Sequence, residues 1–101
     1  EIVGVVEFTV GDAKQPAHVV ILFVDPAHQR KTVGRSLLFH AIDACQRLDP
    51  PPLRMTVNSS PVAMPFYEKH FFQALSEPTN EDGMVATPMG IFLDQVAVWL
   101  N

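Results

Sequence analysis

The stretch ILFVDPAHQRKTVGRSLL, residues 21–38, decides the expected fold of this 101-residue chain. An apolar segment leads into a polar loop, and apolar residues at helical spacing follow. A helix N-terminus presents unpaired N–H groups and a partial positive charge, and phosphates bind there readily. The stretch also supplies the cations Arg30, Lys31 and Arg35, which suit a pyrophosphate or ribose phosphate. Gly34, in the first turn, would let the backbone approach a ligand. The loop lacks the glycine patterns of a Walker loop and of a dinucleotide-binding fingerprint.

The rest of the chain predicts an α/β (α+β) domain with a mixed, mostly antiparallel sheet. Residues 17–24 are almost entirely apolar, which favours a central strand buried on both faces. Asn58-Ser59-Ser60-Pro61 is typical of a helix start, with Ser60 as the cap and Pro61 in the first turn. Residues 79–83 predict a turn. The predicted order is β-β-α-β-α-β-β, with strands at 1–10, 17–24, 53–57, 71–75 and 84–93 and helices at 33–48 and about 58–70.

Composition excludes several classes of protein. The net charge is −4, whereas a protein that tracks nucleic acid usually has a basic balance. No apolar run reaches the length of a membrane span, and no signal peptide opens the chain. Cys45 is the one cysteine, so we expect a buried structural thiol in a cytoplasmic protein. His28, His40 and His70 lack a metal-ligand spacing, so no metal site is predicted.

Two segments carry a family resemblance. Gln29-Arg30-Lys31-Thr32-Val33-Gly34 resembles motif A of the GNAT superfamily, and the segment VNSSPVAMPFYEK, residues 57–69, is similar to its motif B. The Asp82-Gly83 turn and Thr87-Pro88-Met89 look like the closing hairpin of that family. The likeness runs from Ile2 to about Phe92. It implies an acyl-CoA N-acyltransferase fold that lacks the first strand and two helices, with residues 1–93 as the domain and 94–101 as a tail.

The resemblance implies acetyl-CoA as co-substrate and an amine, on a small molecule or a peptide, as acceptor. The family's central strand diverges from the next strand, and pantetheine lies in the gap. Asn58 would contact the pantetheine arm at the end of the diverging strand. The backbone near Leu22, Phe23 and Val24 would hydrogen-bond the pantetheine, and the motif A segment of Gln29, Arg30, Lys31, Thr32, Val33, Gly34 and Arg35 would hold the pyrophosphate.

Two residues are candidates for catalysis by direct attack in a ternary complex. Tyr67 holds the position of a tyrosine that protonates the leaving thiolate, and the alternative for Tyr67 is a core aromatic with a satisfied hydroxyl. His18 holds the position of a glutamate that serves some members as a base, and the alternative is a residue that simply begins a strand near solvent.

The sequence also departs from the family. Thr32 and Phe71 replace two glycines, and we expect Phe71 to avoid a left-handed conformation, so that the helix before it ends differently. The chain begins at Glu1, so we expect the native N-terminus to be missing or the fold to be completed by another subunit. Alternatives to the enzyme are a non-catalytic CoA-binding or assembly module and an unrelated phosphate-binding protein. The apolar residues of 91–93 and 96–100, Trp99 among them, favour a homodimer.

Overall fold

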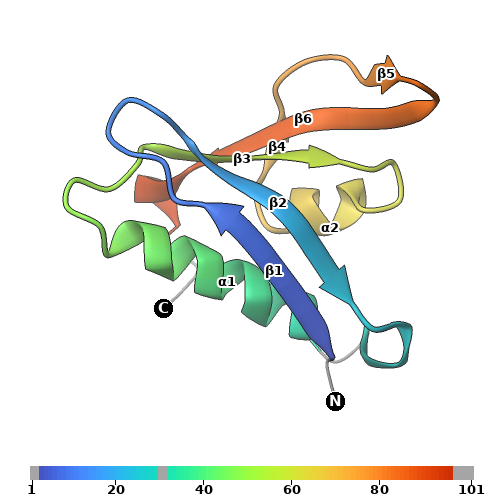
Figure 1. Ribbon diagram of the computed structural model, residues 1–101, viewed down its shortest axis with the longest axis horizontal. Helices are drawn as coiled ribbons and strands as arrows, with labels where there is room; N and C mark the ends of the chain where they lie inside the picture. The colour runs from blue at the N-terminus through green and yellow to red at the C-terminus, as the bar shows by residue number, and fades with distance from the viewer. Residues whose placement is uncertain (1–2, 30–31, 97–101) are drawn as a thin grey trace.

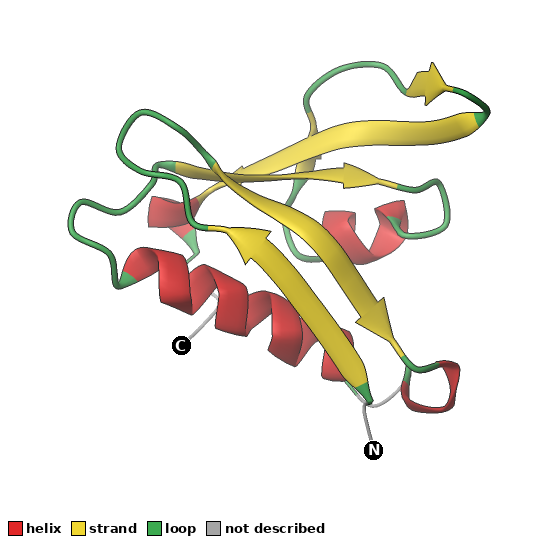
Figure 2. Cartoon of the chain, viewed as in Figure 1, coloured by secondary structure: helices red, strands yellow, loops and turns green. Residues whose placement is uncertain are grey.

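The computed structural model describes residues 3–29 and 32–96, and it contains one six-stranded sheet and two α-helices (Figures 1 and 2). The strand order is β1-β2-β3-β6-β4, with β5 paired to β6, and only the β2–β3 pair is parallel. The predicted class and order are confirmed, with one strand added. The strands are β1 Gly4–Thr9, β2 Ala17–Val24, β3 Arg54–Ser59, β4 Gln73–Ala74, β5 Thr79–Glu81 and β6 Met84–Phe92; the helices are α1 Val33–Gln46 and α2 Met64–Lys69, with 3₁₀ turns at Pro26–His28 and Leu93–Gln95.

Strand β2 separates from β3 halfway along its length. Its register with β1 shifts between Ile21, which pairs with Glu7, and Val19, which pairs with Phe8, so Val20 is an extra, bulged residue. Pairing with β3 stops at the same place, since it covers only residues 17–19 of β2. Figure 1 shows the two strands side by side at one end and far apart at the other. The divergence that the family resemblance implies is therefore confirmed.

The prediction that β2 is buried on both faces is wrong. Ile21 and Phe23 are 47% and 53% exposed. The physical reason is that both helices pack against the opposite face of the sheet, and no described helix covers the face that carries these two side chains. Their apolar character is therefore not explained by burial among the described residues.

Helix α1 provides much of the core. Leu38, Ala41, Ile42 and Cys45 recur at helical spacing and are fully buried against the sheet. Burial raises the pKa of the Cys45 thiol, because water no longer solvates the thiolate. The prediction of a buried structural cysteine is confirmed. From the strands, α2 and the segments that follow α2 and β6, the same core receives Ala17, Val19, Met55, Val57, Tyr67, Phe72, Met89, Ile91, Leu93 and Val96.

The second helix starts later than predicted. Asn58 and Ser59 pair with β6 and extend β3, and α2 begins only at Met64. The hydroxyl of Ser60 accepts a hydrogen bond from the Ala63 N–H at 3.2 Å, so Ser60 caps the turn that precedes the helix. Asn58 lies opposite Pro88 and Ser59 opposite Thr87, so pairing with β6 carries the strand two residues further than predicted.

The C-terminal apolar segment packs inside this chain. Ile91, Leu93 and Val96 are buried in the core, and Phe92 alone of residues 91–93 is exposed. The expectation that 91–93 form an exposed apolar surface is therefore wrong for Ile91 and Leu93. Residues 97–101, Trp99 among them, lie outside the described residues, and the homodimer stays a prediction.

The predicted turn at residues 79–83 forms a hairpin. Thr79–Glu81 becomes strand β5, and Glu81 pairs with Met84 across a two-residue turn. Asp82 and Gly83 both have positive φ, 53° and 82°. Positive φ at both central residues is the type I′ geometry, whose twist matches that of the flanking strands.

Replacing Gly83 tests this turn, because a β-carbon there would meet no atom within 4 Å and the cost is purely conformational. We expect Gly83→Ala to lower the free energy of unfolding by about 1–2 kcal/mol in urea denaturation. Gly83→Asn is the control, since asparagine tolerates the left-handed region, and it should lose less. Equal stability of the alanine variant and the wild type would contradict the left-handed turn.

Candidate functional site

A cavity of about 690 Å³ opens where β2 has separated from β3. Its size lies within the range of small-molecule sites. Its walls come from the second half of β2, the loop after it, the first turn of α1, and α2 with the residues on either side of it. The lining residues are Leu22, Val24, Gln29, Thr32, Gly34, Arg35, Val62, Ala63, Phe66, Tyr67, Lys69, His70 and Phe71.

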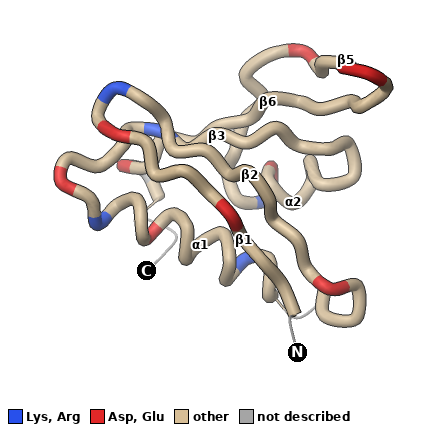
Figure 3. Tube along the Cα trace, viewed as in Figure 1, with Lys and Arg blue, Asp and Glu red and all other residues tan. Residues whose placement is uncertain are grey.

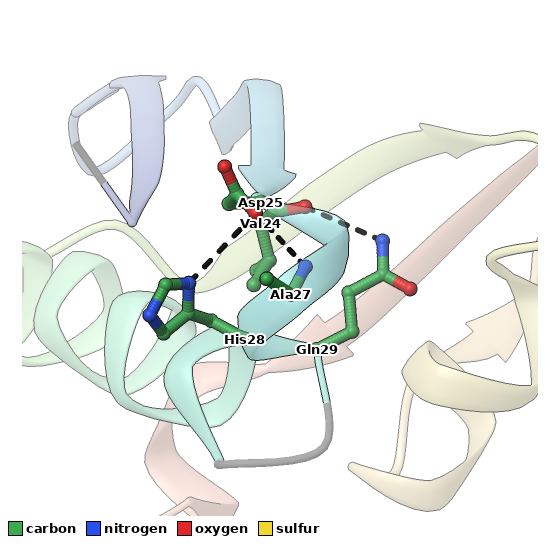
Figure 4. A network of polar contacts seen from close by, with 5 residues as sticks. All are labelled: Val24, Asp25, Ala27, His28 and Gln29. Carbon is green, nitrogen blue, oxygen red and sulfur yellow. Dashed lines mark hydrogen bonds and ion pairs between the residues drawn. The ribbon is translucent and has the colours of Figure 1, made fainter. Parts of the chain in front are cut away.

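Polar contacts hold the loop between β2 and α1 (Figure 4). The Asp25 carboxylate accepts a hydrogen bond from the Ala27 N–H at 2.8 Å, and its Oδ1 lies 3.8 Å from Nδ1 of His28. The Gln29 side-chain amide donates to the Val24 carbonyl at 3.3 Å. The loop thus folds back on the end of β2, so that Gln29 and the start of α1 face the same cavity.

Thr32 and Phe71, which replace family glycines, both keep the left-handed backbone that glycine favours. Their φ values are 61° and 72°. The prediction that Phe71 would avoid this conformation is wrong. A β-carbon in this region costs roughly 1–2 kcal/mol per residue, which packing elsewhere in the fold must offset. Thr32 is the residue immediately before α1 and Phe71 follows α2 by two residues, so both strained residues lie at the ends of helices that line the cavity.

Gly34 lies where α1 and a side chain of α2 approach closely. A β-carbon at this position would lie 3.2 Å from Cε1 of Phe66, which is tighter than ordinary van der Waals contact, and 3.5 Å from Cγ2 of Val24. Phe66 stacks in turn against His70, with ring centroids 4.7 Å apart. The expected close approach at Gly34 is therefore one between α1 and a side chain of α2.

The His70 imidazole joins the two helices. Its Nδ1 lies 2.8 Å from the Phe66 carbonyl, to which it donates a hydrogen bond. Its ring meets Phe39 of α1 edge to face at 6.0 Å, and the Arg35 guanidinium lies 4.9 Å from the centre of the Phe39 ring. An aromatic layer therefore connects the first turns of α1 to the end of α2.

Tyr67 is a buried residue that also lines the cavity. The residue is only 4% exposed, and its ring packs edge to face on Phe66 and Phe72. Loss of solvation raises the pKa of Tyr67 to about 12. Because this pKa lies above a thiol pKa of about 8.5, complete transfer of the phenol proton to a thiolate costs roughly 5 kcal/mol, and the phenol can instead donate a hydrogen bond to a developing thiolate.

His18 lies in β2 among the three residues that pair with β3. Its Nδ1 is 2.8 Å from the Thr56 hydroxyl oxygen, and that hydroxyl donates to the Ala17 carbonyl at 3.3 Å. Since the single hydroxyl hydrogen is used in this way, Nδ1–H donates to Thr56 and Nε2 is the lone-pair nitrogen of the neutral ring. His18 does not line the cavity, but it lies one residue before the last pair of the two strands.

The structure brings part of the predicted set together. Leu22, Val24, Gln29, Thr32, Gly34, Arg35 and Tyr67 line the cavity, whereas Phe23, Val33, Asn58 and His18 do not. Asn58 is exposed in β3, and Arg30 and Lys31 lie outside the described residues. Sequence reasoning missed Phe66 and His70 as lining residues. The available signal was their proximity to Tyr67 in the sequence, since Phe66 directly precedes it and His70 follows it by three residues.

The cavity carries positive charge in an acidic chain. Arg35 and Lys69 line it, and none of its described lining residues is acidic, although the chain has a net charge of −4. The acidic residues are spread over loops, strand β1, the β5–β6 hairpin and both helices, where Asp43 lies in α1 and Glu68 in α2 (Figure 3). This distribution favours an anionic ligand in the cavity.

Within residues 3–29 and 32–96, no group of three or more His, Cys, Asp or Glu residues is placed to hold a metal ion. In the same part of the chain, neither helix is long and apolar enough to cross a membrane.

Comparison with known proteins identifies relatives of this arrangement. A family model described as an acetyltransferase (GNAT) domain matches residues 1–93. A search of curated protein sequences found no match. Among solved structures, a putative N-acetyltransferase from Lactobacillus plantarum is similar at 22% identity and a TM-score of 0.76, over 90% of this chain and 60% of the other.

Two further structures have the same fold. Mutant forms of the spermidine/spermine N-acetyltransferase SpeG from Vibrio cholerae match at 18% identity and a TM-score of 0.77, over 100% of this chain and 63% of theirs. Arabidopsis thaliana NAA60, in complex with a bisubstrate analogue, matches at 12% identity and a TM-score of 0.71, over 89% of this chain and 63% of its own. The chain thus spans 60% to 63% of the lengths of these three proteins.

Tyr67 is the only tyrosine, so its titration can be measured directly by the ultraviolet absorbance of tyrosinate. We expect a pKa of about 12 in the folded protein, against about 10 in the unfolded chain. Because the pKa of Tyr67 is higher in the folded protein than in the unfolded chain, the protonated phenol contributes its full stability to the fold below pH 10. This contribution is lost as the pH rises towards 12. The unfolding free energy should fall by roughly 2–3 kcal/mol across that range.

Tyr67→Phe is the control for this titration. It should lack the absorbance change, and its stability should depend less on pH between 10 and 12. A tyrosinate signal that appears near pH 10 in folded wild type would contradict the burial of the hydroxyl.

Proposed function

The chain belongs to the GNAT acetyltransferase family, and on that premise we propose that it transfers an acetyl group from acetyl-CoA to an amine by direct attack in a ternary complex. The observation that carries the proposal is the cavity at the divergence of β2 and β3, which lies beside the N-terminus of α1 and is lined by two cations and no described acidic residue. An extended, anionic thioester suits that combination of open strand edge and positive charge.

The open edge of β2 receives the pantetheine arm in this proposal. Beyond Val19, the side of β2 that faces β3 has no strand partner in the described sheet, so backbone groups between Leu22 and Val24 are available to hydrogen-bond an extended ligand. The pyrophosphate lies at the first turn of α1, where amide N–H groups have no intrahelical acceptor and Arg35 adds charge. In this proposal, Asn58 contacts the pantetheine arm from β3, on the other side of the gap between β2 and β3.

The chemistry needs few groups. The amine nitrogen attacks the acetyl carbonyl carbon, the carbon–sulfur bond breaks, and CoA leaves as a thiolate. His18, through Nε2, accepts the proton that the amine nitrogen loses. Tyr67 donates a hydrogen bond to the sulfur as its negative charge develops, and its raised pKa keeps this donor protonated at neutral pH. Holding both substrates in one site supplies much of the acceleration.

The acceptor proposed is a cationic amine, on a small molecule or a peptide. One structural neighbour, SpeG from Vibrio cholerae, is a spermidine/spermine N-acetyltransferase, which supports this class. The net charge of −4 is consistent with attraction of a cation to the surface outside the cavity.

Calorimetric titration with acetyl-CoA tests the binding step. We expect one site per chain and a roughly tenfold loss of affinity in Arg35→Ala, with a larger loss at low salt because salt screens the phosphate charge. Arg47→Ala is a matched control, since this arginine pairs with Asp43 outside the cavity and should leave affinity unchanged. The absence of any heat or thermal shift at millimolar acetyl-CoA would overturn the proposal.

Turnover by the full-length protein on a panel of amines tests the catalytic roles. Tyr67→Phe removes the donor and almost no volume, so acetyl-CoA affinity should hardly change while kcat falls roughly 10²-fold. His18→Gln removes the proposed proton acceptor and should also lower kcat. Equal turnover by Tyr67→Phe and wild type would exclude Tyr67 from the mechanism. If the protein binds acetyl-CoA but turns over none of the amines, its function is that of a non-catalytic CoA-binding module.

A further inference from the structure

Two side chains meet across the last paired residues of β2 and β3. His18 lies opposite Thr56 in the parallel register. One further pair follows, Val19 with Val57, before the strands separate. Nδ1 of His18 is 2.8 Å from Oγ1 of Thr56, and that hydroxyl donates to the Ala17 carbonyl at 3.3 Å. Both side chains are partly buried, so the contact is shielded from much of the competing water.

His18 lies on the face of the sheet opposite the helices. Ala17 and Val19 on either side of it are buried in the core, and successive side chains of a strand point to opposite faces. Ile21 and Phe23, further along the same strand, are about half exposed on that face. An acceptor can therefore reach the start of the gap from the side on which His18 lies.

The contact with Thr56 selects the tautomer of His18. A hydroxyl has one hydrogen, and the Ala17 carbonyl can only accept, so the Thr56 hydrogen is used there. The Thr56 oxygen then accepts from the ring, which places the imidazole hydrogen on Nδ1 and the lone pair on Nε2. A neutral imidazole in water carries its hydrogen mostly on Nε2, so this tautomer depends on a partner at Nδ1.

On the basis of the proposed function, we propose that Thr56 is the positioning residue for the His18 base. Thr56 keeps His18 in the tautomer whose Nε2 lone pair accepts the proton that the attacking amine loses. The ring then carries a hydrogen on each nitrogen, and Nδ1–H stays bonded to the Thr56 oxygen while the positive charge develops. In this role Thr56 touches neither substrate, so its whole effect is exerted through His18.

The tautomer is tested without any ligand, by nitrogen NMR of the imidazole rings in the full-length protein. At alkaline pH, where imidazole is neutral, we expect His18 to show the Nδ1–H tautomer in the wild type and in Thr56→Ser. Thr56→Val keeps the branched shape and removes the hydroxyl, so its His18 ring should return to the Nε2–H tautomer. Because the chain has four histidines, His18→Gln identifies the resonances. An unchanged tautomer in Thr56→Val would overturn the inference.

Turnover measures the effect of Thr56 on catalysis. We expect Thr56→Val to lower kcat roughly tenfold, with the KM for acetyl-CoA unchanged, and Thr56→Ser to restore kcat. In a His18→Gln background, Thr56→Val should cause no further loss, because the residue that it positions is gone. Thr79→Val is the matched control. The Thr79 hydroxyl also donates to a strand carbonyl, that of Ala86 at 3.2 Å, but it lies in β5, so kcat should stay unchanged.

Failure of the positioning role and failure of the proposed function give different results. An equal loss of kcat from Thr56→Val in both backgrounds, or undiminished turnover by Thr56→Val, would overturn the positioning role, while turnover by the wild type leaves the proposed function standing. A wild type that turns over no amine would overturn the proposed function and the catalytic part of this inference. The NMR tautomer then decides the remaining part, which is the assignment of the lone pair to Nε2 by Thr56.

Discussion

The divergence of β2 from β3 is the constraint on which the rest of the structure depends. One additional residue, Val20, shifts the register with β1 and changes which side chains of β2 face the helices: Ala17 and Val19 before it, Leu22 and Val24 after it. The parallel ladder to β3 ends at the same point. Sheet backbone that ends its pairing inside a domain must find other partners for its polar groups, and the cavity is the place where a ligand can provide them.

The two helices are held at opposite sides of this opening by an aromatic layer. Gly34 allows Phe66 to approach the first turn of α1, and His70 bonds the Phe66 carbonyl while it packs against Phe39. The distance between the α1 N-terminus and Tyr67 therefore depends on side-chain packing between α1 and α2. Rigid placement of this kind matters for group transfer, because small displacements of reacting groups cost large factors in rate.

Strain is concentrated where the two helices meet the cavity. Thr32 and Phe71 both occupy left-handed conformations at positions where the family motifs have glycine. The backbone geometry is thus maintained although the residue types have changed, which indicates that the turn shape is required and that the side chains are tolerated or used there. Thr32 lines the cavity directly before α1, so the left-handed residue stands at the start of the helix that forms one wall of the site.

Local sequence determined the elements that rest on periodicity and turn chemistry. The apolar spacing of α1, the apolar run of β2 and the Asp82-Gly83 turn are encoded by neighbours within a few residues, and the strand–loop–helix segment of residues 21–38 located one wall of the cavity. Only tertiary structure decided where β2 loses its partner, that Asn58 and Ser59 extend β3 through pairing with β6, and that Phe66, His70 and Phe71 line the cavity. The physical reason is that strand pairing and helix packing join residues far apart in the chain, and their free energy exceeds the roughly 1 kcal/mol preferences that a local sequence can express.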